Sequence, residues 1–146
     1  MDIQMIASFA VISSDPGADR ALFVDAMGLG LHGPEGLRGS DYLFSDDLAG
    51  AKHFGVWPLA EAAESCFGSD RWPDTHTVPQ ASIELEVGSA DQVDRAVAEL
   101  AERGHRLLHG TRTEPWGQVI ARLQSSSGVL VGVCWTPWYH AGPADG

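Results

Sequence analysis

The stretch KHFGVWPL, residues 52–59, decides the fold because VLVGVCWTPW, residues 129–138, repeats its pattern near the other end of the chain. Aligning Gly55 with Gly132 sets FGVW against VGVCW. Both stretches are rich in β-branched and aromatic residues, contain a glycine and meet a proline, which is typical of strands that a proline terminates. The sequence therefore predicts two copies of one unit that meet around a shared space.

The segments upstream of the two stretches repeat as well. Ser8 aligns with Ser82, each in an alternating apolar segment, and seven residues later stand Asp15 and Ser89. Aspartate and serine are favoured N-cap residues, and Ser89 with Gln92 matches a capping box. Apolar residues then recur at helical spacing in both copies. The repeat therefore predicts a strand followed by a helix at the start of each copy.

Periodicity and turn formers predict the remaining elements. We expect strands at 3–13, 41–46, 51–57, 80–87, 105–110, 117–124 and 129–136, and helices at 16–27, 59–67 and 90–103. The glycine-rich passage 28–40 holds at most a short, bent strand. The predicted organisation is a first βαβββ unit (1–67), a linker (68–79), a second βαβββ unit (80–138) and a frayed tail (139–146) in one structural domain.

Composition argues against several classes of partner. The formal net charge of -11 repels nucleic acid and anionic lipid and would favour cationic ligands, although a plain acidic surface explains the same value. The N-terminal MDIQMIASF has no basic region ahead of an apolar run, and we find no membrane-spanning stretch. Cys66 and Cys134 suit a reducing compartment better than a disulfide framework. We therefore expect a cytoplasmic protein with no nucleic-acid or membrane partner.

Within the two predicted βαβββ units, three sequence segments resemble those of a known superfamily: SDPGADRALFVDAMGL (14–29), EPWGQ (114–118) and SSSGVLVGV (125–133). The chain resembles the vicinal-oxygen-chelate superfamily, which includes glyoxalase I, extradiol dioxygenases, fosfomycin-resistance enzymes and bleomycin-binding resistance proteins. The resemblance implies an α+β fold in which the two units pack as a pseudo-twofold pair of half-barrel sheets with the helices outside. It does not imply one function, since members range from metalloenzymes to proteins that only bind a drug.

In the metalloenzymes of that superfamily, a histidine on the first strand of a unit and a carboxylate on its last strand commonly hold a metal. The matching positions here are Ser8 and Ser82, then Gly55 and Gly132. Neither a serine hydroxyl nor a glycine is a credible ligand for zinc, iron or nickel. A two-residue shift would bring in His53 or Glu84 without completing a set of three. The resemblance is therefore closest to the metal-free, antibiotic-binding members, and we expect no metal and no cofactor.

A period of two shows which side chains share a strand face with the aligned residues. These are His53 and Trp57 beside Gly55, Leu130 and Cys134 beside Gly132, Ile6, Ala10 and Ile12 beside Ser8, and Glu84 and Glu86 beside Ser82. The opposite faces carry apolar residues expected to bury under the helices, namely Phe9, Val11, Ile83, Leu85 and Val87. The inner face is thus mixed, which suits a pocket for a sizeable, partly aromatic molecule.

Trp116, in the turn EPWG, stands at the expected rim of that pocket. The candidate ligand-binding residues are therefore Ser8, His53, Gly55, Trp57, Ser82, Glu84, Trp116, Gly132 and Cys134. Each also has a structural explanation, because a strand histidine, core tryptophans, solvated glutamates and a small apolar cysteine are all common. No catalytic residue is identified from the sequence.

These observations favour a small-molecule-binding protein that sequesters a bulky aromatic or cationic compound, such as an antibiotic. The alternative is a glyoxalase- or dioxygenase-like enzyme, a lyase or isomerase, that uses a metal set at other positions or His53 with Glu84. We also expect a homodimer, because a half-barrel sheet leaves edge strands that favour cover.

Overall fold

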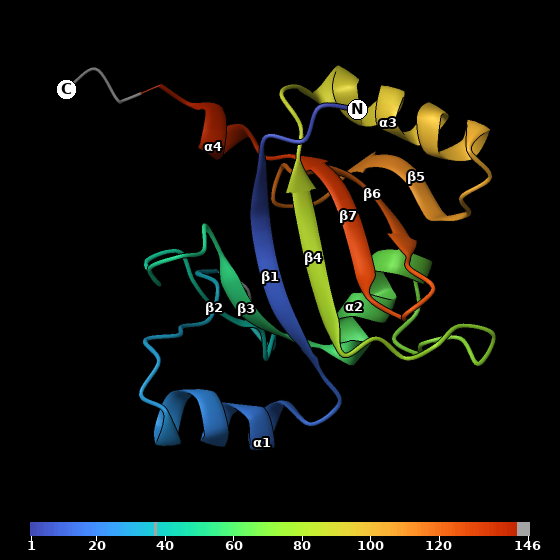
Figure 1. Cartoon of the computed structure of the whole chain (residues 1–146). Helices are drawn as coiled ribbons and strands as arrows, with labels where there is room; N and C mark the ends of the chain where they lie inside the picture. Colours follow the sequence, from blue (N-terminus) through green and yellow to red (C-terminus); the bar gives the residue numbers. More distant parts are fainter. Residues whose placement is uncertain (37, 143–146) are drawn as a thin grey trace.

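The computed structural model describes residues 1–36 and 38–142, which form one mixed, curled sheet with helices packed on it (Figure 1). The strand order is β2-β3-β1-β4-β7-β6-β5. The strands are β1 (Met5–Ser13), β2 (Leu43–Ser45), β3 (Phe54–Pro58), β4 (Ala81–Glu86), β5 (Leu107–Thr113), β6 (Val119–Gln124) and β7 (Leu130–Trp135). The predicted α+β class is confirmed.

The two halves of the sheet meet at β1 and β4, which pair antiparallel. β3 runs parallel to β1, and β7 runs parallel to β4. In these pairs Gly55 lies opposite Ala10 and Gly132 lies opposite Glu84, each two residues after the aligned serines. The register therefore agrees with the internal alignment, and the passage 28–40 contributes one bridge, from His32 to Phe44.

The first three helices start near the predicted residues, whereas a fourth, α4, was not predicted. They are α1 (Pro16–Arg20), which continues as a π-helical segment (Ala21–Ala26), α2 (Leu59–Phe67), α3 (Ala90–Glu102) and α4 (Pro137–His140). Asp15 caps α1 by accepting a hydrogen bond from the Ala18 amide at 3.0 Å. The predicted capping box at Ser89 is wrong, because the Ser89 side chain makes no cap bond and the Gln92 side chain instead accepts from the Gly88 amide.

The outer face of the sheet is covered unevenly. α3 lies over β5, β6 and β7 (Figure 1) and closes a core that includes Val87, Val93 and Val133, with Trp135 packed against it. On the other half, Phe9 stays 43% exposed, so the prediction that it buries under a helix is wrong. Ile6 also faces outward and is 56% exposed, because the register of β1 shifts between Ile6 and Ser8.

Helices α2 and α4 pack against the inner face of the sheet. Helices α1 and α3 lie on the outside, as expected. The core beneath α2 contains Ile12, Trp72 and Leu130, and Trp72 comes from the predicted linker. α4 packs Tyr139 against a small buried cluster, so the expected fraying after Trp138 is wrong for Tyr139 and His140. Residues 143–146 of that tail lie outside the described residues. Among the described residues, no helix is long and apolar enough to cross a membrane.

Candidate functional site

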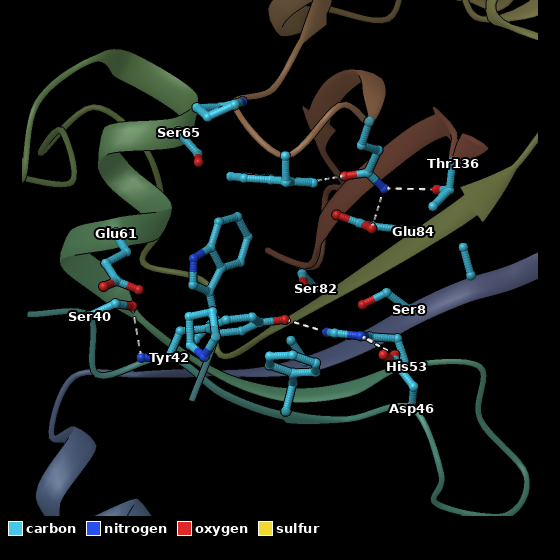
Figure 2. A pocket seen from close by; sticks show the side chains of 18 of the residues that line it. Ser8, Ser40, Tyr42, Asp46, His53, Glu61, Ser65, Ser82, Glu84 and Thr136 are labelled. Atoms are coloured by element: carbon cyan, nitrogen blue, oxygen red, sulfur yellow. Dashed lines mark hydrogen bonds and ion pairs between the residues drawn. The ribbon is translucent and has the colours of Figure 1, made fainter. Parts of the chain in front are cut away.

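The inner face of the sheet holds a cavity of about 660 Å³ that side chains from both halves line (Figure 2). This volume suits a drug-sized molecule. Its aromatic lining residues are Tyr42, Phe44, Trp57, Trp116, Trp138 and Tyr139, and its ionisable ones besides the tyrosines are Arg38, Asp46, His53, Glu61, Glu84 and Arg122. The site is therefore an aromatic cavity with a few polar groups.

A chain of three hydrogen-bonded side chains runs along one wall (Figure 2). His53 Nδ1 lies 2.6 Å from Asp46 Oδ1, and His53 Nε2 lies 2.5 Å from the Tyr42 hydroxyl. Burial, followed by the negative charges of Glu84 and Asp46, raises the pKa of Tyr42 above its usual value. Tyr42 is therefore a neutral phenol that donates to His53, while His53 donates to Asp46.

Gly55 is what allows this arrangement. A Cβ placed on Gly55 would lie 2.8 Å from the Tyr42 hydroxyl and 2.9 Å from Cε2 of its ring. Tyr42 can cross β3 only because that strand has no side chain at this point. Phe44 then stacks on both partners, with ring centroids 5.6 Å from Tyr42 and 5.0 Å from His53. The wall is thus a rigid aromatic layer with one polar chain inside it.

The opposite wall is built around Gln118. Its amide nitrogen donates to Glu84 Oε2 at 3.0 Å and to the Thr136 hydroxyl at 3.2 Å. Its amide oxygen accepts from the Trp116 indole at 3.1 Å. Ser8 and Ser82 lie between this wall and the His53 chain (Figure 2). The amide of Gln118 therefore fixes both a carboxylate and an aromatic ring at the cavity.

Arg122 is buried between the two walls, with only 1% of its side chain exposed. Its Nη1 donates to Glu114 Oε1 at 2.7 Å, and its guanidinium lies 5.4 Å from the centre of the Trp57 ring. Nη1 also lies 3.4 Å from His109 Nε2. Burial lowers the pKa of His109 to about 4, so His109 is uncharged at neutral pH and serves as an acceptor.

Glu86 is fully buried and is not among the residues that line the cavity. Its carboxylate accepts hydrogen bonds from the amide and hydroxyl of Thr136 and contacts His140 Nε2 at 2.9 Å. These bonds attach the start of α4 to β4. Glu86 therefore positions Trp138 and Tyr139, which line the cavity from α4.

Of the nine residues predicted to contact a ligand, six line the cavity: Ser8, His53, Trp57, Ser82, Glu84 and Trp116. Gly55 lies under Tyr42. A Cβ on Gly132 would meet Ile120 at 2.8 Å, so Gly132 also makes room for a side chain. Cys134 is fully buried, and burial raises the pKa of its thiol. Burial likewise raises the pKa of Cys66 to about 11, so neither thiol is a nucleophile at neutral pH.

The donor set does not fit the metal site that the sequence resemblance to metalloenzymes would imply. The described residues contain no group of three or more His, Cys, Asp or Glu side chains that could hold a metal ion. The His53 ring is engaged by Asp46 and Tyr42, and Glu84 is engaged by Gln118. The described residues of this cavity therefore offer no ligand set for a transition metal.

Sequence reasoning missed Tyr42, Asp46 and Arg122. A signal existed, because Tyr42, Phe44 and Asp46 alternate within the predicted strand 41–46, and the period of two applies there as well. The same alternation runs through the predicted strand 117–124, where Gln118 and Arg122 share a face. Alternation along a strand could not predict the hydrogen bond between Tyr42 and His53, because that bond depends on the space above Gly55.

The sequence matches no protein-family model and no curated protein. The fold is similar to that of the hypothetical protein BH1468 from Bacillus halodurans C-125 (TM-score 0.59, 18% identity, 97% of this chain and 98% of that one). It is also similar to a glyoxalase/bleomycin resistance protein/dioxygenase superfamily member from Vibrio splendidus 12B01 (TM-score 0.55, 14% identity, 92% of this chain and 100% of that one). Methylmalonyl-CoA epimerase from Streptomyces coelicolor is a third similar structure (TM-score 0.55, 17% identity, 92% of this chain and 96% of that one). At these identities the likeness establishes the fold.

Proposed function

Because the chain has the fold of the vicinal-oxygen-chelate superfamily, which unites glyoxalases, bleomycin-resistance proteins and dioxygenases, we propose that it binds a bulky aromatic or cationic small molecule in the cavity. It sequesters that molecule, an antibiotic for example, without a bound metal. Lowering the free concentration of a toxic compound requires affinity and no chemistry.

The aromatic lining is the observation that carries this proposal. Trp57, Trp116 and Trp138 face the cavity together with Tyr42, Phe44 and Tyr139. Aromatic side chains contribute large contact areas and favour stacked or edge-to-face neighbours. A planar ligand of several rings would therefore find contacts on more than one wall.

Acidic groups support a cationic substituent on the ligand. Glu61 enters the cavity from α2 (Figure 2), where Asp46 and Glu84 also line it. The whole chain carries a formal net charge of -11, which draws cations toward the site.

Fluorescence titration tests the proposal, because tryptophans line the cavity. Purified protein is titrated with a panel of aromatic antibiotics, and the dissociation constants are compared for wild type and Trp57→Leu. Loss of a stacking contact in a desolvated site costs about 2 kcal/mol or more, which is roughly thirtyfold in Kd. Absence of saturable binding across the panel contradicts the proposal.

Trp135→Leu is the matched control. Trp135 packs against the core under α3 on the outer face, away from the cavity. Both variants lose stability, but only Trp57→Leu is expected to lose affinity per folded molecule. Equal affinities in the two variants would show that Trp57 is ordinary core and that the binding site lies elsewhere.

A second candidate function rests on the Asp46–His53–Tyr42 chain. Asp46 orients the His53 ring, so that Nε2 accepts a proton through Tyr42 from a ligand in the cavity. This arrangement suits a lyase or isomerase that moves a proton next to a carbonyl. The expected partner of His53 was Glu84, but the hydrogen bonds of His53 go to Asp46 and Tyr42.

The test for this candidate is proton exchange in D2O, with the hemithioacetal of glutathione and methylglyoxal as the probe. Catalysed isomerisation or deuterium incorporation that His53→Gln abolishes supports the enzyme. His105→Gln is the control, because His105 is exposed and does not line the cavity. Rates equal to the uncatalysed reaction in the wild type contradict this candidate.

A further inference from the structure

One buried donor on a side chain that lines the cavity makes no hydrogen bond among the described residues. Nη2 of Arg122 makes no hydrogen bond among the described residues, although the side chain is 99% buried and lines the cavity. The nearest carboxylate oxygen, Oε1 of Glu84, lies 3.7 Å away, which is beyond hydrogen-bond distance. A buried charged donor without an acceptor is costly, so its N–H groups are available to an oxygen on a bound molecule.

The rest of the guanidinium is held firmly in place. Nη1 is bonded to Glu114, and the Trp57 ring lies 5.4 Å from the central carbon. Glu84 in turn is retained by Gln118 through its other oxygen. The guanidinium of this cavity-lining side chain is therefore held on one side by Glu114, and Oε1 of Glu84 stays 3.7 Å from Nη2.

The charges around Nη2 indicate an uncharged acceptor. Arg122 and Arg112 form ion pairs with Glu114, and Arg122 also lies beside Glu84. The two positive charges are thus balanced by two negative ones. A ligand carboxylate would add a negative charge beside Glu84 in a buried site, whereas a carbonyl oxygen accepts the same hydrogen bond without that repulsion.

We propose that Nη2 of Arg122 is the polar anchor of the site and that it takes an uncharged carbonyl oxygen attached to the aromatic part of the ligand. The ligand class is then an aromatic ketone, amide or lactone whose ring stacks near Trp57. This inference rests on the proposed binding function, and it names the group that such a ligand carries.

Three naphthalene compounds of nearly equal size test this anchor by equilibrium dialysis: naphthalene-2-carboxamide, 2-naphthoate and 2-methylnaphthalene. In the wild type, the carboxamide is expected to bind roughly tenfold or more tighter than the methyl compound, the effect of one hydrogen bond to a charged donor. The naphthoate is expected to bind more weakly than the carboxamide.

Arg122→Lys keeps a cation for Glu114 but removes the second guanidinium nitrogen. The ratio of the Kd of the methyl compound to the Kd of the carboxamide should therefore fall close to one. Arg112→Lys is the matched control, because Arg112 shares Glu114 but does not line the cavity, and it should keep the preference. Glu84→Gln tests whether the negative charge of Glu84 disfavours a ligand carboxylate, with Arg122 itself unchanged. It should raise the affinity for naphthoate relative to carboxamide roughly tenfold.

The outcomes distinguish failure of the Arg122 anchor from failure of the aromatic binding site. Equal binding of the carboxamide and the methyl compound to the wild type overturns the anchor and leaves the aromatic site standing. An unchanged preference in folded Arg122→Lys also overturns the anchor. Binding of none of the three compounds contradicts the aromatic site itself and, with it, the anchor.

Discussion

At the scale of single residues, the space above one glycine decides the geometry of the site. The Tyr42 hydroxyl occupies the place that a Cβ on Gly55 would fill, and from there it reaches His53. Gly55→Ala is therefore expected to lower the free energy of unfolding by about 1 to 3 kcal/mol, the usual cost of an added methyl group in a packed site. Urea denaturation measures this loss.

Gly110→Ala is the matched control for that variant. Gly110 also lies in a strand, and a Cβ there would meet nothing within 4 Å. It should change stability by no more than about 0.5 kcal/mol. Similar losses in both variants would contradict the contact between Gly55 and Tyr42.

The tyrosines provide a pH test at the same scale. The chain has two, Tyr42 and Tyr139, and burial raises the pKa of both, that of Tyr139 to about 12. A free tyrosine ionises with a pKa of about 10. Near pH 10 the native protein should therefore show almost no tyrosinate absorbance, whereas the urea-unfolded chain should be half ionised.

The same shift determines how stability depends on pH. The native state holds phenolic protons that the unfolded state releases, so the two tyrosines stabilise the fold fully below about pH 10. That contribution is lost progressively above this pH, as ionisation of the unfolded chain begins. Tyrosinate absorbance in the native protein at pH 10 would show that the hydroxyls are exposed, contrary to the structure.

At the scale of elements, a buried carboxylate attaches α4 to the sheet. Glu86 on β4 accepts from Thr136 at the start of α4 and contacts His140 at its end. Glu86→Ala leaves the buried Thr136 amide and hydroxyl without their acceptor, which should cost about 2 kcal/mol or more in the free energy of unfolding. Ligand affinity should also fall, because Trp138 and Tyr139 line the cavity from α4.

Denaturation and titration of Glu86→Ala are compared with those of Glu64→Ala. Glu64 is an exposed residue of α2, and its removal should leave both stability and affinity unchanged. A stable Glu86→Ala variant with wild-type affinity would show that α4 is held by its apolar contacts alone.

At the scale of the whole molecule, the outer face of the β1–β3 half is only partly covered by α1 and the π-helical segment after it. Ile6 and Phe9 are exposed on β1, and Leu22 and Met27 are exposed in and just after the π-helical segment, each by more than 40%. Exposed apolar patches of this kind mark interaction surfaces. The homodimer expected from the sequence remains a prediction, and we propose that it buries this face.

Light scattering should then give twice the mass of the chain at micromolar concentration. Phe9→Asp should give a folded monomer, and Val78→Asp, at another exposed apolar residue, should leave the dimer intact. A wild-type monomer would contradict the prediction.

Metal content is also a property of the whole molecule. Because Ser8, Ser82, Gly55 and Gly132 supply no ligand and the described residues offer no cluster, the protein should purify without stoichiometric zinc, iron or nickel. Its melting temperature should be the same with and without chelator, since removal of a bound metal would lower it by mass action. Elemental analysis that finds one equivalent of a tightly bound metal would refute this.

The sequence by itself determined the strands and the first three helices, their order, and the inner face of several strands, but not α4. The pattern that placed His53 and Trp57 on that face is local, because alternation along a strand depends only on backbone geometry. The same local signals predicted the cap at Asp15 and the helix 59–67.

Only the tertiary structure decided which side chains meet across the cavity. Three features depend on neighbours that are distant in the chain: Tyr42 over Gly55, the Arg122 nitrogen that makes no hydrogen bond among the described residues, and the burial of Glu86. The irregular register of β1 between Ile6 and Ser8 likewise arises in pairing with β4. Such contacts reflect how the available space is filled once the two halves have packed, and a local pattern carries no information about that space.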